Sequence, residues 1–224
     1  LHLLVSPLAF AISNETARYY LNGVYLHTVN GELKAAATDG HRFALNRTPL
    51  DAEFAGIIMS AKTVGLVPQG EICFSVSDTK IKITAADWEM ESKLIDGTYP
   101  DYERIIPTKN DKLITVDNGT MRAAADRVAT VSAEKSRAVK IAVDAGRVTL
   151  SVNGASGDAT EEFECDYNGE AITFGLNSQY LAAEAGMFPA GPLVLSIADA
   201  GSPVLFTAPG APELLGIVMP MRVN

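Results

Sequence analysis

Apolar and polar residues alternate along several stretches of the chain, and this alternation limits what the chain can fold into. Val148, Leu150 and Val152 are separated by single polar residues, and the same period of two recurs at 139–143 and 80–83. Successive side chains of a strand point to opposite faces of a sheet. The pattern therefore predicts many strands with one buried face.

The stretch TEEFECDY at 160–167 adds an acidic face to this pattern. Phe163, Cys165 and Tyr167 should share one face of a strand, and the acidic residues between them the other. Cys165 and Cys73 are the only cysteines, too few for a disulfide framework or a zinc site, so we expect free thiols in a reducing compartment. The three histidines lack metal-ligand spacing. The sequence predicts neither a metal nor a cofactor.

Helical patterns are fewer than strand patterns. Near the start of the chain, Ser6 is expected to be the N-cap of a helix whose first residue is Pro7. The predicted helices lie at about 7–17, 60–67, 120–131 and 178–186. Two helices and several strands in each half predict an α+β protein in which sheet dominates.

The two halves of the chain also resemble each other. GVYLHTVNG at 23–31 aligns with GRVTLSVNG at 146–154, and GEICFSVSD at 70–78 aligns with GPLVLSIAD at 191–199. Both offsets are close to half the chain, which predicts duplicated domains rather than a solenoid of short repeats. The prolines of YPDYERIIP favour extended chain between them. The predicted domains are therefore 1–107 and 108–224.

Composition narrows the classes of function. The chain has 224 residues, of which 47% are hydrophobic and 20% charged, as in an ordinary globular protein. No apolar run approaches the roughly 18 residues of a membrane helix. The net charge of −9 argues against indiscriminate nucleic-acid binding. It still allows a few positive groups gathered on one surface.

Three interpretations compete for the stretch TDGHR at 38–42. Asp39 and Gly40 predict a hairpin with a type I′ turn, in which both central residues have positive φ. A hydrolase would use His41 as a general base oriented by Asp39. Alternatively, the small residues around the turn leave a shallow docking surface with His41 and Arg42 at its rim. The local sequence leaves these interpretations open.

Two other stretches suggest binding surfaces. In RYYLNG, Arg18 precedes Tyr19 and Tyr20, a cation and two rings of a kind that can stack on bases. In GIVMPMRVN, Met219 and Met221 near the end of the chain suit an adaptable apolar surface. Each residue also has an ordinary structural role, as core or as solvated surface.

Together these motifs resemble the bacterial sliding clamp, the processivity subunit of the replicative DNA polymerase. The matching stretches are RYYLNG, ATDGHR, LIDGTYPDYERIIP and VMPMR, in the order and at the distances that are typical of the family. The resemblance implies tandem copies of the DNA-clamp fold, with two helices packed on antiparallel sheet in each. This chain would hold the second and third of three copies, with about 120 residues expected before Leu1.

The resemblance also implies a peptide-binding groove between these two copies. Polymerases, the clamp loader and repair proteins would dock there through short linear motifs. Its residues would be Leu21, Thr38, Gly40, His41, Arg42, Phe43, Pro100, Arg104, Ile105, Val204, Ile217, Val218, Met219, Pro220, Met221 and Arg222. Phe43 stands where an aliphatic residue is more usual, and Ser136 where an aromatic one occurs. Phe43 should narrow the floor of the groove, and Ser136 should open it.

Two more surfaces follow from the resemblance. Duplex DNA would be encircled without sequence readout, through inward-facing residues. Those residues would be Arg18, Tyr19, Tyr20, Lys62, Arg122, Arg127 and Lys135. A homodimeric ring would close through Thr130 and Val131 and a row of carboxylates on a sheet edge, which comprises Glu161, Glu162 and Glu164.

The function predicted from the sequence is therefore a non-catalytic, cytoplasmic DNA clamp. It would tether polymerases to duplex DNA and recruit partner proteins by their peptides, without a membrane role. The alternatives are a hydrolase that uses His41 and Asp39, and a peptide-binding module without a DNA role.

Overall fold

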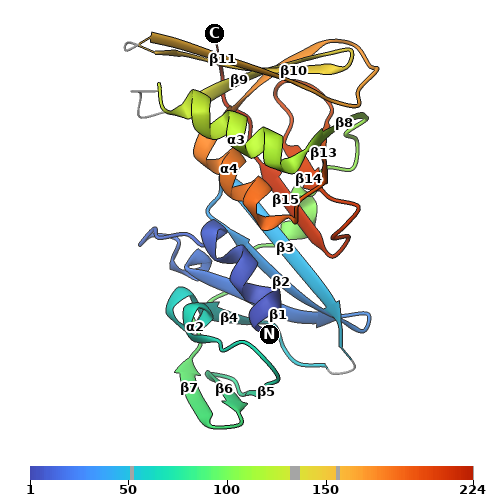
Figure 1. The fold of residues 1–224 in the computed structure, drawn as a ribbon. Coiled ribbons are helices and arrows are strands. Elements are labelled where there is room, and N and C mark those ends of the chain that lie inside the picture. Colours follow the sequence, from blue (N-terminus) through green and yellow to red (C-terminus); the bar gives the residue numbers. More distant parts are fainter. Residues whose placement is uncertain (51–52, 132–136, 155–156, 224) are drawn as a thin grey trace. The chain divides into compact units, whose positions relative to one another are not determined.

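Antiparallel strands dominate the computed structural model, which describes residues 1–50, 53–131, 137–154 and 157–223 (Figure 1). The chain divides into unit 1, Leu1–Asp101, and unit 2, Tyr102–Asn224. The division falls between Pro100 and Pro107, the two prolines that suggested a boundary at residue 107. The α+β class and the tandem arrangement predicted from the sequence are confirmed. Within the described residues, no helix is long and apolar enough to cross a membrane.

Unit 1 begins with a short helical segment and continues into two antiparallel sheets. Its elements are α1 (His2–Val5), η1 (Ser6–Ala11), η2 (Tyr19–Leu21), β1 (Gly23–Val29), β2 (Glu32–Thr38), β3 (Arg42–Pro49), β4 (Ile57–Ser60), α2 (Ala61–Leu66), β5 (Cys73–Val76), β6 (Lys80–Ala85) and β7 (Trp88–Lys93). One sheet has the order β4-β1-β2-β3 and the other the order β5-β6-β7. The core contains Leu8, Leu26 and Met59, all fully buried.

Unit 2 has longer helices over the same kind of sheets. Its elements are η3 (Tyr102–Ile105), β8 (Lys112–Asp117), α3 (Asn118–Ala129), β9 (Ala138–Asp144), β10 (Arg147–Gly154), β11 (Gly157–Glu164), β12 (Ile172–Asn177), α4 (Ser178–Met187), β13 (Pro192–Ile197), β14 (Val204–Thr207) and β15 (Leu214–Val218). The sheet orders are β11-β10-β9-β12 and β15-β14-β13-β8. Met121, Phe174 and Phe206 lie in one buried cluster.

The strands and three of the four predicted helices are confirmed. The alternating stretches form β6, β9, β10 and β11, and the inward positions of β9 and β10 are buried. The helices predicted at 60–67, 120–131 and 178–186 are α2, α3 and α4. Alternation identified these strands because each has one apolar face against helices or core.

The predicted first helix is wrong in its start and its length. Ser6 has the helical angles φ −63° and ψ −36°, whereas an N-cap is extended, and α1 has already begun at His2. Pro7 lacks an amide hydrogen and its ring crowds the carbonyl four residues earlier, so the α-helix gives way to the 3-10 segment η1. The helical segment ends at Ala11, because Ile12 is extended and the Ser13 amide donates to the Leu21 carbonyl.

The internal repeat is present, but one of the two sequence alignments is displaced by a strand. β1 lies between β4 and β2 in its sheet, as β9 lies between β12 and β10, so β1 corresponds to β9 rather than to β10. The turn at Gly31, with φ +76°, therefore matches the turn at Gly146, with φ +77°. The alignment of 70–78 with 191–199 is consistent with the topology, because β5 and β13 each follow the second helix of their unit.

Candidate functional site

The TDGHR stretch forms the connection between β2 and β3, and the Asp39 carboxylate organises it. Asp39 Oδ1 accepts hydrogen bonds from the amides of His41 (2.9 Å) and Arg42 (3.1 Å), and Oδ2 accepts one from Arg42 Nε (3.0 Å). The Thr38 hydroxyl donates to the Arg42 carbonyl (2.6 Å) and accepts from the Gly40 amide (3.0 Å). Side chains of the turn thus satisfy its backbone groups.

The hairpin is confirmed, but its turn is not type I′. Thr38 pairs with Phe43, so four residues lie between the paired positions instead of two. Gly40 has φ +90°, and Asp39 is not among the residues with positive φ. The Asp39 side chain accepts hydrogen bonds from the amides of His41 and Arg42, which favours this longer turn over the type I′ turn. Its role in the turn accounts for Asp39 without any catalytic step.

Arg42 is held on two sides within unit 1. Besides its ion pair with Asp39, its guanidinium carbon lies 5.1 Å from the centre of the Phe10 ring in η1. A cation over a ring face is stabilised by the ring's negative potential. The structure thus shows that Arg42 is fixed by η1 and by its own turn.

Arg18 lies against the same turn. Its Nε and Nη2 donate to Glu15 Oε2 (2.8 Å) and Oε1 (2.7 Å), and Nη2 also donates to the Asp39 carbonyl (3.1 Å). The hydrogen bonds from Arg18 hold the pKa of the Glu15 carboxyl below its usual value. The RYYLNG and TDGHR motifs, about 20 residues apart in the sequence, are therefore in contact.

The residues predicted to form a peptide groove differ in exposure. In unit 1, His41 and Gly40 are exposed, whereas Leu21 and Phe43 are buried. In unit 2, Val204, Ile217 and Val218 are buried, and the more accessible members are Pro220, Met221, Arg222, Arg104, Ile105 and Met219. Ile105 and Met219 expose 45% and 44% of their surface, which is high for apolar side chains.

The end of the chain is anchored to its own unit. The Met221 amide donates to the Gly175 carbonyl of β12 (2.8 Å), and Val218 pairs with Val204. A Cβ at Gly175 would lie 2.6 Å from the Met221 carbonyl oxygen, so only glycine allows this approach. The exposed Met219 is thereby fixed between two paired positions.

The cations predicted to face DNA are less available than the sequence suggested. Arg127 in α3 donates from Nε and Nη2 to the Glu161 carboxylate (2.7 and 3.1 Å). Lys62 in α2 is exposed, and Tyr19 and Tyr20 form an edge-to-face pair with centroids 5.9 Å apart. Arg122 in α3 is exposed and has no ion pair with the part of the chain that is described. Lys135 and Ser136 lie outside the described residues.

The prediction of one acidic row on a sheet edge is wrong in part. β11 is the edge of its sheet, but Glu161 lies on the face opposite to Glu162 and Glu164 because side chains alternate along a strand. Glu161 points toward α3 and pairs with Arg127, while Glu162 pairs with Arg147 of β10 (3.2 Å). The other members, Val131 and Thr130, follow α3, and the Thr130 hydroxyl donates to the Arg127 carbonyl.

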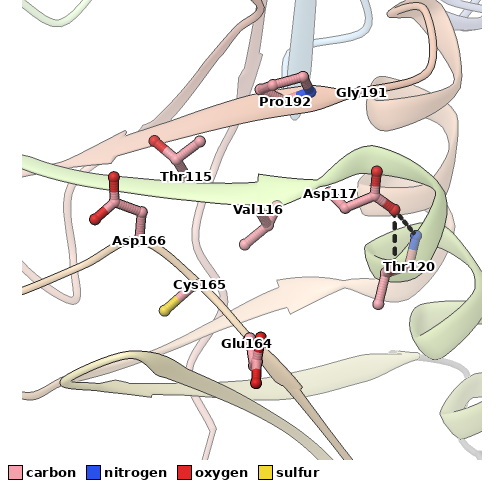
Figure 2. Close-up of a pocket in the computed structure, with 9 residues that line it drawn as sticks. All are labelled: Thr115, Val116, Asp117, Thr120, Glu164, Cys165, Asp166, Gly191 and Pro192. Atoms are coloured by element: carbon pink, nitrogen blue, oxygen red, sulfur yellow. Dashed lines mark hydrogen bonds between the residues drawn. The ribbon is translucent and has the colours of Figure 1, made fainter.

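A cavity of about 560 Å³ lies in unit 2, beside the bridge between Thr115 of β8 and Asp166 (Figure 2). It is lined by Thr115, Val116, Asp117, Thr120, Glu164, Cys165, Asp166, Gly191 and Pro192. Asp117 caps α3 through the Thr120 amide and hydroxyl, both at 2.8 Å, and burial raises the pKa of the Cys165 thiol. These groups have structural roles. Sequence reasoning missed the cavity because a bridge between residues about 50 apart leaves no local signal.

No metal centre is indicated. Within the described ranges, no group of three or more His, Cys, Asp and Glu side chains is placed to hold a metal ion. Each unit has its own candidate surface: unit 1 has a fixed turn with arginines that are paired with carboxylates, and unit 2 has exposed apolar side chains and the paired Arg127. Such groups suit non-covalent recognition of peptides or phosphates.

Comparison with known proteins shows which family the chain resembles. Residues 1–101 match the family model of the DNA polymerase III beta subunit, central domain, and residues 103–222 that of its C-terminal domain. The beta sliding clamp of Caulobacter vibrioides is 44% identical over 98% of this chain and 63% of its own length. That of Pseudomonas putida is 32% identical over 100% of this chain and 64% of its own.

Solved structures of beta sliding clamps have a closely similar fold. A crystal structure of the beta sliding clamp of C. crescentus has a TM-score of 0.94 and 42% identity, and it covers 99% of this chain and 63% of its own. The clamp of Bartonella birtlesii, bound to griselimycin, has a TM-score of 0.94 and 36% identity, with 99% and 64% covered. The chain thus spans a little under two thirds of the length of these relatives.

Proposed function

The chain belongs to the DNA polymerase III beta subunit family, and on this premise we propose that it acts as a sliding clamp. In this role it is a non-catalytic subunit that encircles duplex DNA and tethers polymerases to it. The tandem match to the central and C-terminal domains, over nearly the whole chain, carries the proposal. A cytoplasmic location fits this role.

Partner proteins dock through short linear peptides in this proposal. The groove residues named from the sequence supply a fixed turn from unit 1 and the exposed Met219, with its neighbour Met221, from unit 2. Methionine side chains adapt their shape to aliphatic or aromatic anchors, and arginines at the rim donate hydrogen bonds. Replicative and repair polymerases and the clamp loader are the partners that such a groove would serve.

Fluorescence anisotropy with a labelled peptide Gln-Leu-Ser-Leu-Phe tests this docking. We expect binding in the micromolar range and a loss of about 1–2 kcal/mol in Met219→Ala or Met221→Ala, because each removes apolar surface buried by the peptide. Met90→Ala is the matched control, since Met90 is a half-buried methionine of β7 outside the proposed groove. Absence of binding, or equal losses in all three variants, contradicts the groove.

DNA is held weakly and without sequence preference in this proposal. The net charge is −9, and two of the arginines predicted to face DNA are already paired with carboxylates. Retention by an encircling ring therefore has to matter more than affinity for phosphates. A titration of linear duplex at rising salt should show a steep loss of binding. Sequence-specific binding that survives high salt contradicts the proposal.

Assembly is the remaining part of the proposal. Two subunits with three clamp domains each would close a ring head to tail, which needs a different surface at each end of the subunit. β11 with its carboxylates is the edge offered by unit 2. Light scattering on residues 1–224 should give a monomer, because they match only the central and C-terminal domains of the family and so would offer only one of the two surfaces. A stable dimer at micromolar concentration contradicts this assignment of the interface.

A further inference from the structure

The contacts of Arg18 point to a role that differs from DNA binding. Its guanidinium is folded back on the 39–42 turn, with Nη2 donating to the Asp39 carbonyl and both Nε and Nη2 donating to Glu15. We propose that Arg18, held by Glu15, is a positioning residue that fixes the 39–42 turn for peptide binding. This inference rests on the proposed function and adds a role that the family resemblance did not assign.

Gly40 shows how closely the guanidinium approaches the turn. A Cβ built on Gly40 would lie 2.6 Å from Arg18 Nη1 and 3.3 Å from its Cζ, so the guanidinium occupies the space where a side chain would be. Gly40 also has φ +90°, which L side chains rarely adopt. The glycine therefore meets two demands at once: the conformation of the turn and the room that Arg18 needs.

An arginine suits this position better than a lysine. The planar guanidinium donates two roughly parallel hydrogen bonds to one carboxylate, and here the same group reaches a backbone carbonyl and lies against Gly40. A lysine ammonium is a single point charge and cannot make the paired contact to Glu15 while it reaches the Asp39 carbonyl. The arrangement thus predicts that Arg18→Lys is not a conservative change.

Three contacts together fix the turn. Arg18 holds the Asp39 carbonyl, the Asp39 carboxylate holds the amides of His41 and Arg42, and the Arg42 guanidinium lies over Phe10. A turn fixed before binding loses less conformational entropy when a peptide docks. Removal of Arg18 should therefore weaken peptide binding by loosening the turn.

The same contacts oppose DNA binding by Arg18. A phosphate would have to displace the Glu15 carboxylate, which already accepts two hydrogen bonds from the guanidinium. Arg122 differs, because it is exposed and the described residues give it no such carboxylate. Arg18 should accordingly contribute less to duplex binding than Arg122 does.

The experiment compares Arg18→Ala, Arg18→Lys and Glu15→Ala with Arg122→Ala in the intact protein. The probes are the labelled Gln-Leu-Ser-Leu-Phe peptide and a labelled linear duplex at low salt. We expect both Arg18 variants to weaken peptide binding by about tenfold, the usual scale for one lost charge-assisted hydrogen bond. Duplex affinity should fall less in Arg18→Ala than in Arg122→Ala, and it should rise in Glu15→Ala, which frees the guanidinium.

Arg147→Ala is the matched control for the peptide measurement. Arg147 forms a surface pair with Glu162 outside the proposed groove, so its removal should leave peptide affinity unchanged. The proposal is overturned if Arg18→Ala weakens duplex binding as much as Arg122→Ala does. Unchanged peptide affinity in both Arg18 variants overturns it as well.

Hydrogen exchange gives a readout that does not depend on the peptide. The amides of His41 and Arg42, both bonded to Asp39, should exchange faster in Arg18→Lys, while the melting temperature stays close to that of the unmodified protein. If the unmodified protein binds no peptide, the proposed function fails, and this exchange still decides the positioning role. Unchanged exchange at both amides contradicts that role.

Discussion

The two units share one plan but build its helical layer differently. Gly23 at the start of β1 pairs with Ser60, the N-cap of α2, as Ala138 at the start of β9 pairs with Asn177, the N-cap of α4. On this plan unit 2 has helices of 12 and 10 residues. Unit 1 has a four-residue helix that continues as a 3-10 segment, and a second helix of six residues.

The difference has local causes. Pro7 interrupts the first helical segment of unit 1, and Gly65 and Pro68 limit α2. In unit 2 no proline lies within α3 or α4, and Asp117 and Asn177 cap them through side-chain oxygens. The sheets tolerate this contrast because strand pairing, not helix length, defines the plan. A repeated fold is thus conserved in its strand order more strictly than in its helices.

The largest expected effect on stability is at the first residue of β1 and of β9. Gly23 is changed to alanine and Ala138 to glycine, so that each strand receives the residue of the other. A Cβ on Gly23 would lie 2.1 Å from the Met59 carbonyl oxygen, so Gly23→Ala has to separate β1 from β4. We expect a loss of about 4 kcal/mol in the free energy of unfolding, which is large for a single substitution. Ala138→Gly should cost about 0.5–1 kcal/mol, from backbone entropy alone. Urea denaturation of both variants measures the contrast, and equal losses would mean that the strands at Gly23 make room for a Cβ without losing their pairing.

A smaller contrast is expected in the helical layers. Leu8 in η1 and Leu181 in α4 are both fully buried, so changing either of them to alanine leaves a cavity. We expect a loss of about 3 kcal/mol for Leu181→Ala and about 2 kcal/mol for Leu8→Ala, because an irregular segment relaxes into a cavity more easily than a regular helix. A larger loss at Leu8 in chemical denaturation would mean that η1 is the more rigid of the two.

The caps of α2 and α3 should differ in their response to pH. Hydrogen bonds from Thr120 hold the pKa of the Asp117 carboxyl below its ordinary value of 3.8, whereas Ser60 caps α2 without a titrating group. A lowered folded-state pKa contributes stability that is fully present above pH 3.8 and is lost as the pH falls through the folded-state value.

Substitution separates these two caps. Asp117→Asn keeps a capping oxygen without the charge, so it should lose less stability than the unmodified protein when the pH falls below 3.8. Ser60→Ala should cost about 1 kcal/mol, and its effect should not change with pH. Thermal unfolding at neutral and acid pH tests both variants. Parallel pH curves for Asp117→Asn and the unmodified protein would show that the charge of Asp117 is not involved.

The smallest effect is expected at Pro7. Pro7→Ala restores an amide hydrogen and removes the ring, so the α-helix that begins at His2 should continue through the region of η1. The free energy of unfolding should change by less than about 1 kcal/mol, since the gain in helix is offset by greater freedom of the unfolded chain. Amide exchange across 6–11 reports the change. A retained 3-10 segment would mean that packing, not Pro7, sets its geometry.

The sequence predicted what depends on local pattern. Alternation found β9, β10 and β11, and Asp39 with Gly40 found the hairpin, because strand faces and turns are encoded within a few residues. The sequence did not predict the contacts of Arg18 with the Asp39 carbonyl and of Arg127 with Glu161, because the partners are about 20 and 34 residues apart.

The correspondence of strands between the two units, and the faces on which the carboxylates of β11 lie, were also not predicted correctly from the sequence. The shared Val-Asn-Gly at 29–31 and 152–154 suggested a correspondence that the strand order corrects, because turns of similar composition follow several of the strands. The carboxylates of β11 were treated as one row, although their alternation assigns Glu161 to a different face from Glu162. The motif order identified the family, but the orientation of each side chain required the three-dimensional structure.

Cys73 has a practical consequence for any measurement of assembly. Its thiol is free and exposed on β5, which pairs with β6 and is an outer strand of its sheet in the described part of the chain. Edge strands of two molecules approach each other readily, and an exposed thiol there is open to oxidation in air. Covalent pairs formed through Cys73 would appear as dimers in light scattering. A reducing agent, or Cys73→Ser, removes this artefact and leaves only the association that the protein itself encodes.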